Sequence, residues 1–355
     1  MKPAQSPAGR KASFGRRFAA IAVGVLVGAW GLGLVAGATG PAGASGTDAP
    51  SLLVEPGQRG AVYSVLTSPA HCLDMTMYEL VDPLAESDLA ADAARGVKVR
   101  VVLDRNREES SNMAAYEYLS AHGVKVHWAP VSYDATHEKA VVVDAGYPDE
   151  RALIMTLNLT ARYYATTRDF AVMDHAPSDV AAIESVFDAD FSGDQSARTP
   201  PGLDLVWSPG SEQALLALIG SARRSLDVEN EEMANGQVVA ALSAAARSGV
   251  VTRVTMTYDS DYSSELSELV AAGVGVHVYP STSSVLYIHA KVIIVDAGSS
   301  TEKAFVGSEN FSTASMGYNR ELGIIITDHA VVDELAKVLS RDHAGAPAYK
   351  GGTDQ

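Results

Sequence analysis

The sequence predicts an α/β protein built from an internal repeat of one folding unit, with the two halves facing each other around a single site. The octapeptide His-Glu-Lys-Ala-Val-Val-Val-Asp at residues 137–144 recurs 152 residues later as His-Ala-Lys-Val-Ile-Ile-Val-Asp at residues 289–296. Each half also alternates short apolar strands with helices. The length of 355 residues suits two ordinary domains, and 47% hydrophobic with 20% charged residues is a globular composition.

The repeat extends well beyond the His-Lys motif. Residues 72–74 match residues 225–227 at an offset of 153, and residues 122–127 match residues 272–277 at an offset of 150. Because the offset drifts so little, we expect the two halves to differ mainly in the lengths of their loops.

Each half reads as helices layered on a sheet. Apolar residues recur at helical spacing after Pro56 and Pro209, and glycines such as Gly96 and Gly123 end later helical stretches. Short β-branched runs indicate buried strands, so the alternation predicts a mostly parallel or mixed sheet. In the first half we expect helices after Pro56 and near residues 84–95, 113–119 and 180–187, and strands near residues 73–78, 98–103, 125–128, 139–143, 153–157 and 170–173.

Composition divides the chain into five parts. Residues 1–44 begin with basic residues, continue with an apolar run and end with small residues, which is the order of a cleaved signal peptide. An uncleaved membrane anchor is the alternative, since the run is nearly long enough to span a bilayer. We therefore expect a secreted protein, or an anchored one if the signal is retained. The other parts are an N-terminal half at residues 50–195, a linker at 196–203, a C-terminal half at 204–345 and a disordered tail at 346–355.

The charge of the chain argues against a stable nucleic acid partner. The formal net charge is −16, and loss of the five basic side chains in residues 1–44 would take it to −21. Such a surface repels phosphates and gains nothing general from counterion release, although a local basic pocket is still allowed. Cys72 is the single cysteine, so an exported chain would have no internal disulfide.

The repeated motif supplies matched groups for holding a phosphate ester. Alternate side chains of a strand share a face, so the histidine and lysine of each motif should project side by side. An asparagine follows each histidine by 21 residues, at the end of the next expected strand. The matched groups are His137 with His289, Lys139 with Lys291, and Asn158 with Asn310.

If the halves face each other, these groups form one pocket for a phosphodiester. The lysines and amides can hold the oxygens on which negative charge grows during displacement. One neutral imidazole can attack phosphorus while the other, protonated, donates to the departing oxygen and later activates water. Because the lysines neutralise charge and no cluster has metal-ligand spacing, we expect no metal and no other cofactor.

Each histidine also needs a carboxylate that orients its ring. Asp169 lies 32 residues after His137, and Glu321 lies 32 residues after His289. Both acids open short apolar strands, from which they can bind the non-reacting ring nitrogen and stabilise the imidazolium. The sequence leaves open whether each acid serves its own half or the other half.

These residues resemble the phospholipase D superfamily. The resemblance rests on the paired His-x-Lys-x-x-x-x-Asp motifs, on Gly-Ser-Glu-Asn at residues 307–310 and on the acid of the following strand, and the repeat covers nearly all of residues 54–345. It implies two tandem α/β/α sandwich halves in a pseudo-twofold arrangement, one active site and a phosphohistidine intermediate. The first half departs from the pattern, with Met-Thr-Leu-Asn at residues 155–158.

The resemblance also implies a role for each matched residue. His137 is expected to be the nucleophile, and His289 the general acid and base. The lysines and asparagines are expected to bind phosphate, whereas Asp144 and Asp296 are expected to be structural.

Two other pairs match between the halves. His127 and His277 have no accompanying lysine, so we interpret them as structural histidines with satisfied hydrogen bonds. Glu79 and Glu232 either hold the pocket from a third strand or are exposed at a strand end.

The favoured substrate is a phospholipid at a membrane surface. Tyr163, Tyr164 and the apolar stretch at residues 285–288 lie beside the motifs and favour access for lipid. The corresponding reaction is that of a phospholipase D, which releases phosphatidic acid and a head-group alcohol and can transfer the phosphatidyl group to another alcohol. The alternatives are a secreted metal-independent endonuclease and an inactive module that binds phosphate or lipid, while cardiolipin-type synthesis is a weaker option. One chain holds both halves, so we expect a monomer.

Overall fold

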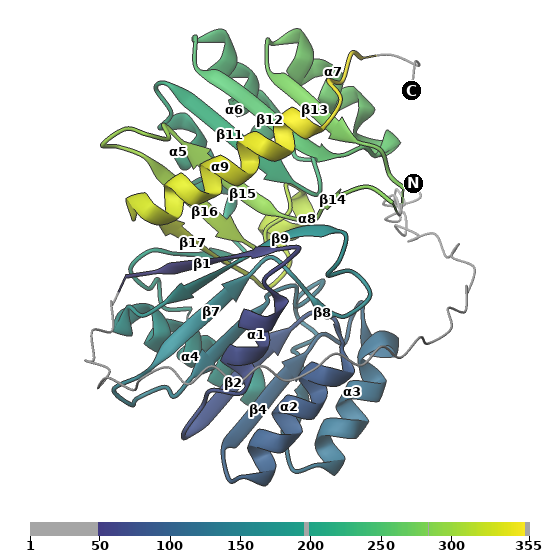
Figure 1. Ribbon diagram of the computed structural model, residues 1–355, viewed down its shortest axis with the longest axis vertical. Coiled ribbons are helices and arrows are strands. Elements are labelled where there is room, and N and C mark those ends of the chain that lie inside the picture. The colour runs from purple at the N-terminus through teal and green to yellow at the C-terminus, as the bar shows by residue number, and fades with distance from the viewer. Residues whose placement is uncertain (1–48, 195–198, 283, 352–355) are drawn as a thin grey trace, which may run out of the picture. The chain divides into compact units, whose positions relative to one another are not determined.

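The repeat gives two mixed sheets with the same strand order. Figure 1 shows these two sheets and labels most of their strands. The computed structural model describes residues 49–194, 199–282 and 284–351. The expected signal peptide at residues 1–44 and residues 196–198 of the expected linker lie outside the described residues. The chain from Thr47 onward is one compact unit, which contains both halves.

The first half forms a sheet in the order β1-β9-β7-β6-β2-β4-β5. Strands β2, β4 and β5 are parallel, and β6, β7, β9 and β1 continue the sheet by antiparallel pairing. Its elements are β1 (Ser51–Glu55), α1 (Arg59–Leu66), β2 (Cys72–Met77), β3 (Leu80–Val81), α2 (Pro83–Ala94), β4 (Lys98–Leu103), α3 (Glu109–Ala121), β5 (Lys125–Trp128), β6 (Ala140–Val143), β7 (Arg151–Met155), β8 (Leu159–Thr160), β9 (Thr167–Asp174) and α4 (Pro177–Ser192).

The second half repeats this topology as β10-β17-β16-β15-β11-β12-β13. Again three strands are parallel and the remainder antiparallel. Its elements are β10 (Leu205–Ser208), α5 (Glu212–Gly220), β11 (Ser225–Asn230), α6 (Gly236–Arg247), β12 (Val251–Thr257), a 3-10 turn (Ser260–Tyr262), α7 (Ser263–Ala271), β13 (Gly275–Tyr279), β14 (Tyr287–Ile288), β15 (Lys291–Val295), β16 (Lys303–Gly307), α8 (Thr313–Gly317), β17 (Glu321–Ile326) and α9 (His329–Gly345).

Local sequence explains where several helices begin. The side chains of Asp82, Asn235 and Asp328 accept hydrogen bonds from the first backbone N–H groups of α2, α6 and α9, respectively. Those N–H groups have no partner within their own helix, so a capping side chain satisfies them. In α2, Pro83 occupies the first helical position, where its missing N–H costs no hydrogen bond.

Three large apolar cores and one small cluster around Phe187 hold the described layers together. The two faces of strand β6 contribute to different cores. Val141 and Val143 pack with α1, α2 and α3 in the outer core of the first half. Ala140 and Val142 pack in a central core. The central core also contains side chains from β15, α4 and α9, so both halves contribute to it. The second half has its own outer core. Alternate side chains of one strand thus join the fold of a half to the contact between halves.

The expected strands and helices of the first half are confirmed, with boundaries shifted by a few residues. Strands β1 and β10 were not predicted, because each is a short edge strand that precedes the apolar pattern used to find the repeat. The predicted disorder of residues 346–355 is wrong for the start of that segment. The N–H of Val278 donates to the carbonyl of Pro347 at 2.9 Å, and Tyr349 is buried against the outer core of the second half.

In the described parts of the chain, no helix combines the length and the apolar character needed to cross a bilayer.

The halves exchange backbone pairing. Strand β14 of the second half adds to the first sheet by parallel pairing with Thr167 and Arg168 of β9. In the opposite direction, Thr136 forms a parallel bridge with Arg320, next to the start of β17. Each His-x-Lys motif is therefore attached to a strand of the other half.

Two buried ion pairs cross in the same symmetric way. Arg168 of the first half binds Asp342 on α9 through two hydrogen bonds of 2.5 and 3.1 Å. Arg320 of the second half binds Asp190 on α4 through two hydrogen bonds of 3.0 and 3.3 Å. All four side chains are buried, so each charge depends on its partner in the other half for compensation.

We predict that Arg320→Ala lowers the free energy of unfolding by about 3–5 kcal/mol, because it leaves the buried Asp190 carboxylate without its partner. Denaturant-induced unfolding measures this change. The matched control is Arg105→Ala, which removes an exposed arginine paired with Glu109 and should cost at most about 1 kcal/mol. Equal losses in the two variants would contradict the role of the crossing pair.

Candidate active site

The two His-x-Lys motifs meet where the halves exchange their strands. The backbone N–H of His137 donates to the carbonyl of Arg320 at 2.8 Å, and that of His289 donates to the carbonyl of Arg168 at 3.2 Å. Both histidines lie just ahead of a buried strand, β6 or β15, which fixes their backbone. The predicted single site between the halves therefore has a structural basis in these exchanged hydrogen bonds.

Each histidine is bound by the acid of the other half. Nδ1 of His137 lies 2.7 Å from Oε2 of Glu321, and Nδ1 of His289 lies 2.7 Å from Oδ1 of Asp169. This answers the question that the sequence left open, since the pairing is across the halves rather than within them. The remaining nitrogen of each ring, Nε2, is the one left for chemistry.

Further side chains hold the two acids in place. Asp169 accepts a hydrogen bond of 2.6 Å from the hydroxyl of Thr156, which belongs to the first half's departure from the Gly-Ser-Glu-Asn pattern. Glu321 accepts bonds from Ser315 at 2.6 Å and from Asn319 at 3.0 Å. Ser315 and Asn319 occupy Oε1 of Glu321, so this carboxylate presents Oε2 to His137. In Asp169 the Thr156 hydroxyl binds Oδ1, the same oxygen that faces His289, and so holds that oxygen in place.

Burial keeps the His137 imidazole neutral. It lowers the pKa of His137 to about 4, against the opposing effect of Glu321 and with a further lowering by the two lysines. Burial alone would raise the pKa of Glu321, but its interaction with His137, which includes a hydrogen bond, and the nearby Lys139 outweigh burial and the net shift is downward. At neutral pH the pair is therefore a neutral imidazole whose Nδ1–H donates to a carboxylate.

Lys139 is buried against an aromatic ring. Its ammonium lies 5.0 Å from the centre of the Tyr78 ring and donates to the carbonyl of His137. The edge of the same ring contacts His137, with the two ring centres 4.6 Å apart. Burial lowers the pKa of Lys139 to about 7, with Glu321 opposing and Lys291 adding to the shift. Part of the Lys139 population is thus uncharged near neutral pH.

Lys291 differs from Lys139 because it already has an acidic partner. Its ammonium lies 3.0 Å from Oε2 of Glu231 and 2.5 Å from the carbonyl of His289. Both lysines were predicted to bind the substrate phosphate, and Glu231 was not predicted to be part of the site. In this structure the second lysine is neutralised by a protein carboxylate.

The two asparagines follow strands β7 and β16 by three residues each. The amide nitrogen of Asn310 lies 3.5 Å from the same Glu231 oxygen that binds Lys291. The side-chain oxygens of Asn158 and Asn310 are both buried and have no hydrogen-bond partner among the residues that the structure describes. Asn310 thus lies with the Lys291 group. For Asn158, membership of the pocket stays a prediction.

Asp144 and Asp296 bind backbone. Asp144 accepts hydrogen bonds from the N–H groups of Ala70, His71 and Cys72 at the start of β2, and Asp296 does the same for residues 223–225 at the start of β11. Burial opposes these bonds, but they lower the pKa of both carboxyl groups. Each aspartate therefore ties the far end of its motif strand to the neighbouring strand.

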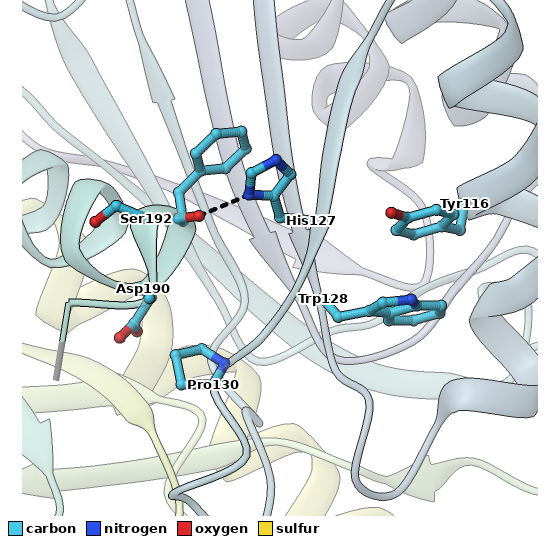
Figure 2. Close-up of a pocket in the computed structure, with 8 residues that line it drawn as sticks. Tyr116, His127, Trp128, Pro130, Asp190 and Ser192 are labelled. Atoms are coloured by element: carbon cyan, nitrogen blue, oxygen red, sulfur yellow. Dashed lines mark hydrogen bonds between the residues drawn. The ribbon is translucent and has the colours of Figure 1, made fainter.

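The interpretation of His127 and His277 as structural is confirmed. Nδ1 of His127 binds the carbonyl of Phe191 at 2.7 Å, and Nδ1 of His277 binds the carbonyl of Ala346 at 2.7 Å. Figure 2 shows His127 beside a hollow that Tyr116, Trp128 and Asp190 also line. The hollow is lined by no histidine or lysine of the two His-x-Lys motifs and by neither asparagine, so the site is placed by the chemistry of those groups rather than by this depression.

Glu79 is buried and Glu232 is half-buried. Glu79 accepts a hydrogen bond of 2.9 Å from Thr160, and burial raises its pKa. Burial and the neighbouring Glu231 raise the pKa of Glu232 to about 7. The reading as exposed strand-end carboxylates is therefore wrong for both.

Glu231, Tyr78 and the hydroxyl groups that hold the acids were not predicted from the sequence. A signal for the first two was present. Tyr78 directly follows β2, and Glu231 directly follows β11, so they occupy the same repeat position. Because their chemistry differs, a search for identical residues passes over them.

The family of the chain follows from comparison with known proteins. Residues 62–191 and 215–343 each match the family model described as cardiolipin synthase, PLD-like domain, and the two segments cover more than half of the chain. The chain belongs to this phospholipase D-like family. No curated protein matches its sequence.

Solved structures similar to this phospholipase D-like chain share its fold. A phosphatidylserine synthase from Haemophilus influenzae superposes with a TM-score of 0.62 at 12% identity, covering 85% of this chain and 88% of that one. A polyphosphate kinase from Porphyromonas gingivalis superposes with a TM-score of 0.63 at 15% identity, covering 86% of this chain. The present chain spans 50% of the length of that kinase. At such low identity, these likenesses show the fold alone.

Replacing either acid should reduce turnover more than substrate affinity. We predict that Asp169→Asn and Glu321→Gln each lower kcat by about 10²-fold or more, with KM within a few-fold, because the histidine loses the group that orients its ring. Steady-state kinetics on a phosphodiester test this. Unchanged kcat in both variants would rule out the orienting role.

Proposed function

We propose that this protein is a phosphodiesterase that acts on glycerophospholipids as a phospholipase D. It would release phosphatidic acid and a head-group alcohol, or transfer the phosphatidyl group when an alcohol replaces water. The observation that carries the proposal is the pair of histidines from opposite halves, each bound through Nδ1 to a carboxylate and flanked by a buried lysine. Such a pair can provide one nucleophile and one proton carrier within a single pocket.

In the first step, Nε2 of His137 attacks phosphorus and forms a P–N bond. The bond between phosphorus and the head-group oxygen breaks, and His289 gives its proton to that oxygen. In the second step His289 takes a proton from water, whose oxygen attacks phosphorus and displaces His137. Phosphatidic acid leaves, and both histidines return to their starting states.

The assignment of the nucleophile to His137 is supported by its surroundings. A nucleophilic imidazole must be unprotonated, and burial lowers the pKa of His137 to about 4. Its neighbours favour the same role, since Glu321 accepts the Nδ1 proton and can stabilise the positive charge that grows on the ring during attack.

The lysines would stabilise the transition state. Negative charge grows on the phosphoryl oxygens during displacement, and a buried ammonium acts more strongly on it than an exposed one would. Lys139 packs against an aromatic ring, so its ammonium can form an ion pair with the substrate phosphate. Lys291 already forms an ion pair with Glu231, so the phosphate must compete with that carboxylate.

A lipid substrate is supported by the surface beside the site. Val131 and Tyr318 are 68% and 57% exposed, although both are large and apolar. They lie on the loops that lead to His137 and Glu321, and these loops are joined by a hydrogen bond from the N–H of Asp134 to the carbonyl of Tyr318 at 3.1 Å. Exposed apolar side chains on two loops that contact each other can bind the apolar part of a membrane surface. The net charge of −16 disfavours a long nucleic acid. Secretion, which the N-terminal sequence suggests, would give the enzyme access to such surfaces.

We predict that the protein releases choline from phosphatidylcholine vesicles in the presence of EDTA, and that His137→Ala loses at least about 10³-fold in rate because the nucleophile is gone. Choline release measures the reaction. His122→Ala is the matched control, since His122 is exposed at the end of α3 and should leave the rate unchanged.

The same preparations should be incubated with plasmid DNA. Nicked plasmid together with intact lipid would identify an endonuclease instead, and vesicle binding without cleavage of either substrate would indicate a non-catalytic module. A loss of choline release on adding EDTA would contradict the expected independence from metal.

The pH profile of kcat/KM should be a bell with its maximum between about pH 4 and pH 7. Neutral His137 is the active form and is present above its pKa of about 4, so activity rises through that pH. Protonated Lys139 is the active form and is present below its pKa of about 7, so activity falls above it. Lys139→Arg should move the alkaline limb upward, because guanidinium stays charged. An alkaline limb unchanged in this variant would contradict the assignment.

A further inference from the structure

A carboxylate lies where the phosphate-binding donors of the second half converge. Oε2 of Glu231 is 3.0 Å from Nζ of Lys291, 3.5 Å from Nε2 of His289 and 3.5 Å from the amide nitrogen of Asn310. Lys291 and Asn310 are the two second-half residues expected to bind the substrate phosphate, and His289 is the expected general acid and base beside it. A phosphate oxygen can reach them only beside this carboxylate or in its place.

The carboxylate is built into the site. Oε1 of Glu231 accepts a hydrogen bond of 2.8 Å from the hydroxyl of Tyr287, on the strand that joins the other half's sheet. The side chain is 15% exposed. Burial would raise its pKa, but Lys291 and His289 outweigh burial and the net shift is downward, so the group is ionised.

The first half has no such charge at the equivalent position. There Tyr78 places its ring against Lys139 and His137. The two halves of the pocket are therefore electrostatically different, with an aromatic face beside one lysine and an anion beside the other.

The charge of Glu231 acts differently on substrate and product. A phosphodiester carries one negative charge, whereas a phosphate monoester carries close to two at pH 7 because its second pKa is about 6. The repulsive energy from a fixed carboxylate is proportional to the ligand charge, so it is nearly twice as large for the monoester.

We propose that Glu231 is a specificity-determining residue that favours binding of a phosphodiester over a phosphate monoester, and so promotes release of the monoester product. The inference rests on the phosphodiesterase activity proposed above. It holds for any diester, whether the rest of the substrate is lipid or not.

The test compares methyl phosphate with dimethyl phosphate as competitive inhibitors of the cleavage of bis(4-nitrophenyl) phosphate at pH 7 and constant ionic strength. If Glu231→Gln tightens dimethyl phosphate binding by about threefold, the doubled repulsion predicts about tenfold for methyl phosphate. Glu268→Gln, an exposed variant on α7 with the same change in net charge, should alter neither constant.

Equal changes for the two inhibitors in Glu231→Gln, or no change, would overturn the inference. If Glu231→Gln does not fold, Glu231→Ala removes the same charge and allows the same comparison of the two inhibitors with wild type. Equal changes for the two inhibitors in that variant would also overturn the inference. Because neither probe is a lipid, failure to cleave phosphatidylcholine affects only the proposed function. If the chromogenic diester is not cleaved either, calorimetry of both probes measures the same ratio.

Discussion

Two Arg-acid dipeptides, one in each half, contact the opposite half and stabilise both the fold and the site. Arg168-Asp169 on β9 and Arg320-Glu321 at the start of β17 each place an arginine in a buried ion pair with a helix of the other half. The acid that follows binds a histidine of the other half. One register error would leave a buried charge unpaired and a histidine without its orienting group. The contact that holds the halves together is therefore also the contact that assembles the site.

Symmetric backbones carry asymmetric chemistry. The strand order, the motif aspartates and the crossing arginines are duplicated, yet the position after β2 holds Tyr78 and the position after β11 holds Glu231. An aromatic ring leaves the charge of Lys139 available to an anion, whereas Glu231 neutralises Lys291. This difference gives a physical reason for distinct roles of His137 and His289, which the duplicated motif alone does not provide.

Much of this arrangement could be predicted from the sequence, because a duplicated pattern marks both the fold and the matched side chains. The repeat identified both histidines, both lysines and the two acids, and the family comparison shows the two tandem domains. The direction of the His–acid pairing could not be predicted, since Asp169 and Glu321 are equally spaced from their own motifs and only tertiary contact distinguishes the halves. Glu231 was not predicted, because the residue at the equivalent position of the first half is Tyr78. Tyr349 is held by a hydrogen bond to Val276, 73 residues earlier in the chain. The glycine-rich sequence at the end of the chain gives no sign of this long-range contact.

The central claim is that His137, oriented by Glu321 of the other half, is the nucleophile of one shared site. The most direct measurement is mass spectrometry of the protein quenched in alkali during turnover of bis(4-nitrophenyl) phosphate, using His289→Ala. The 4-nitrophenolate leaving group needs no proton from His289, so this variant still forms the intermediate and only its breakdown is slowed. The account predicts a phosphoryl adduct on the peptide that contains His137, and a strong reduction of that adduct when Glu321→Gln is added. An adduct on His289 in the otherwise unmodified protein, or an adduct on His137 that is indifferent to Glu321, would contradict it.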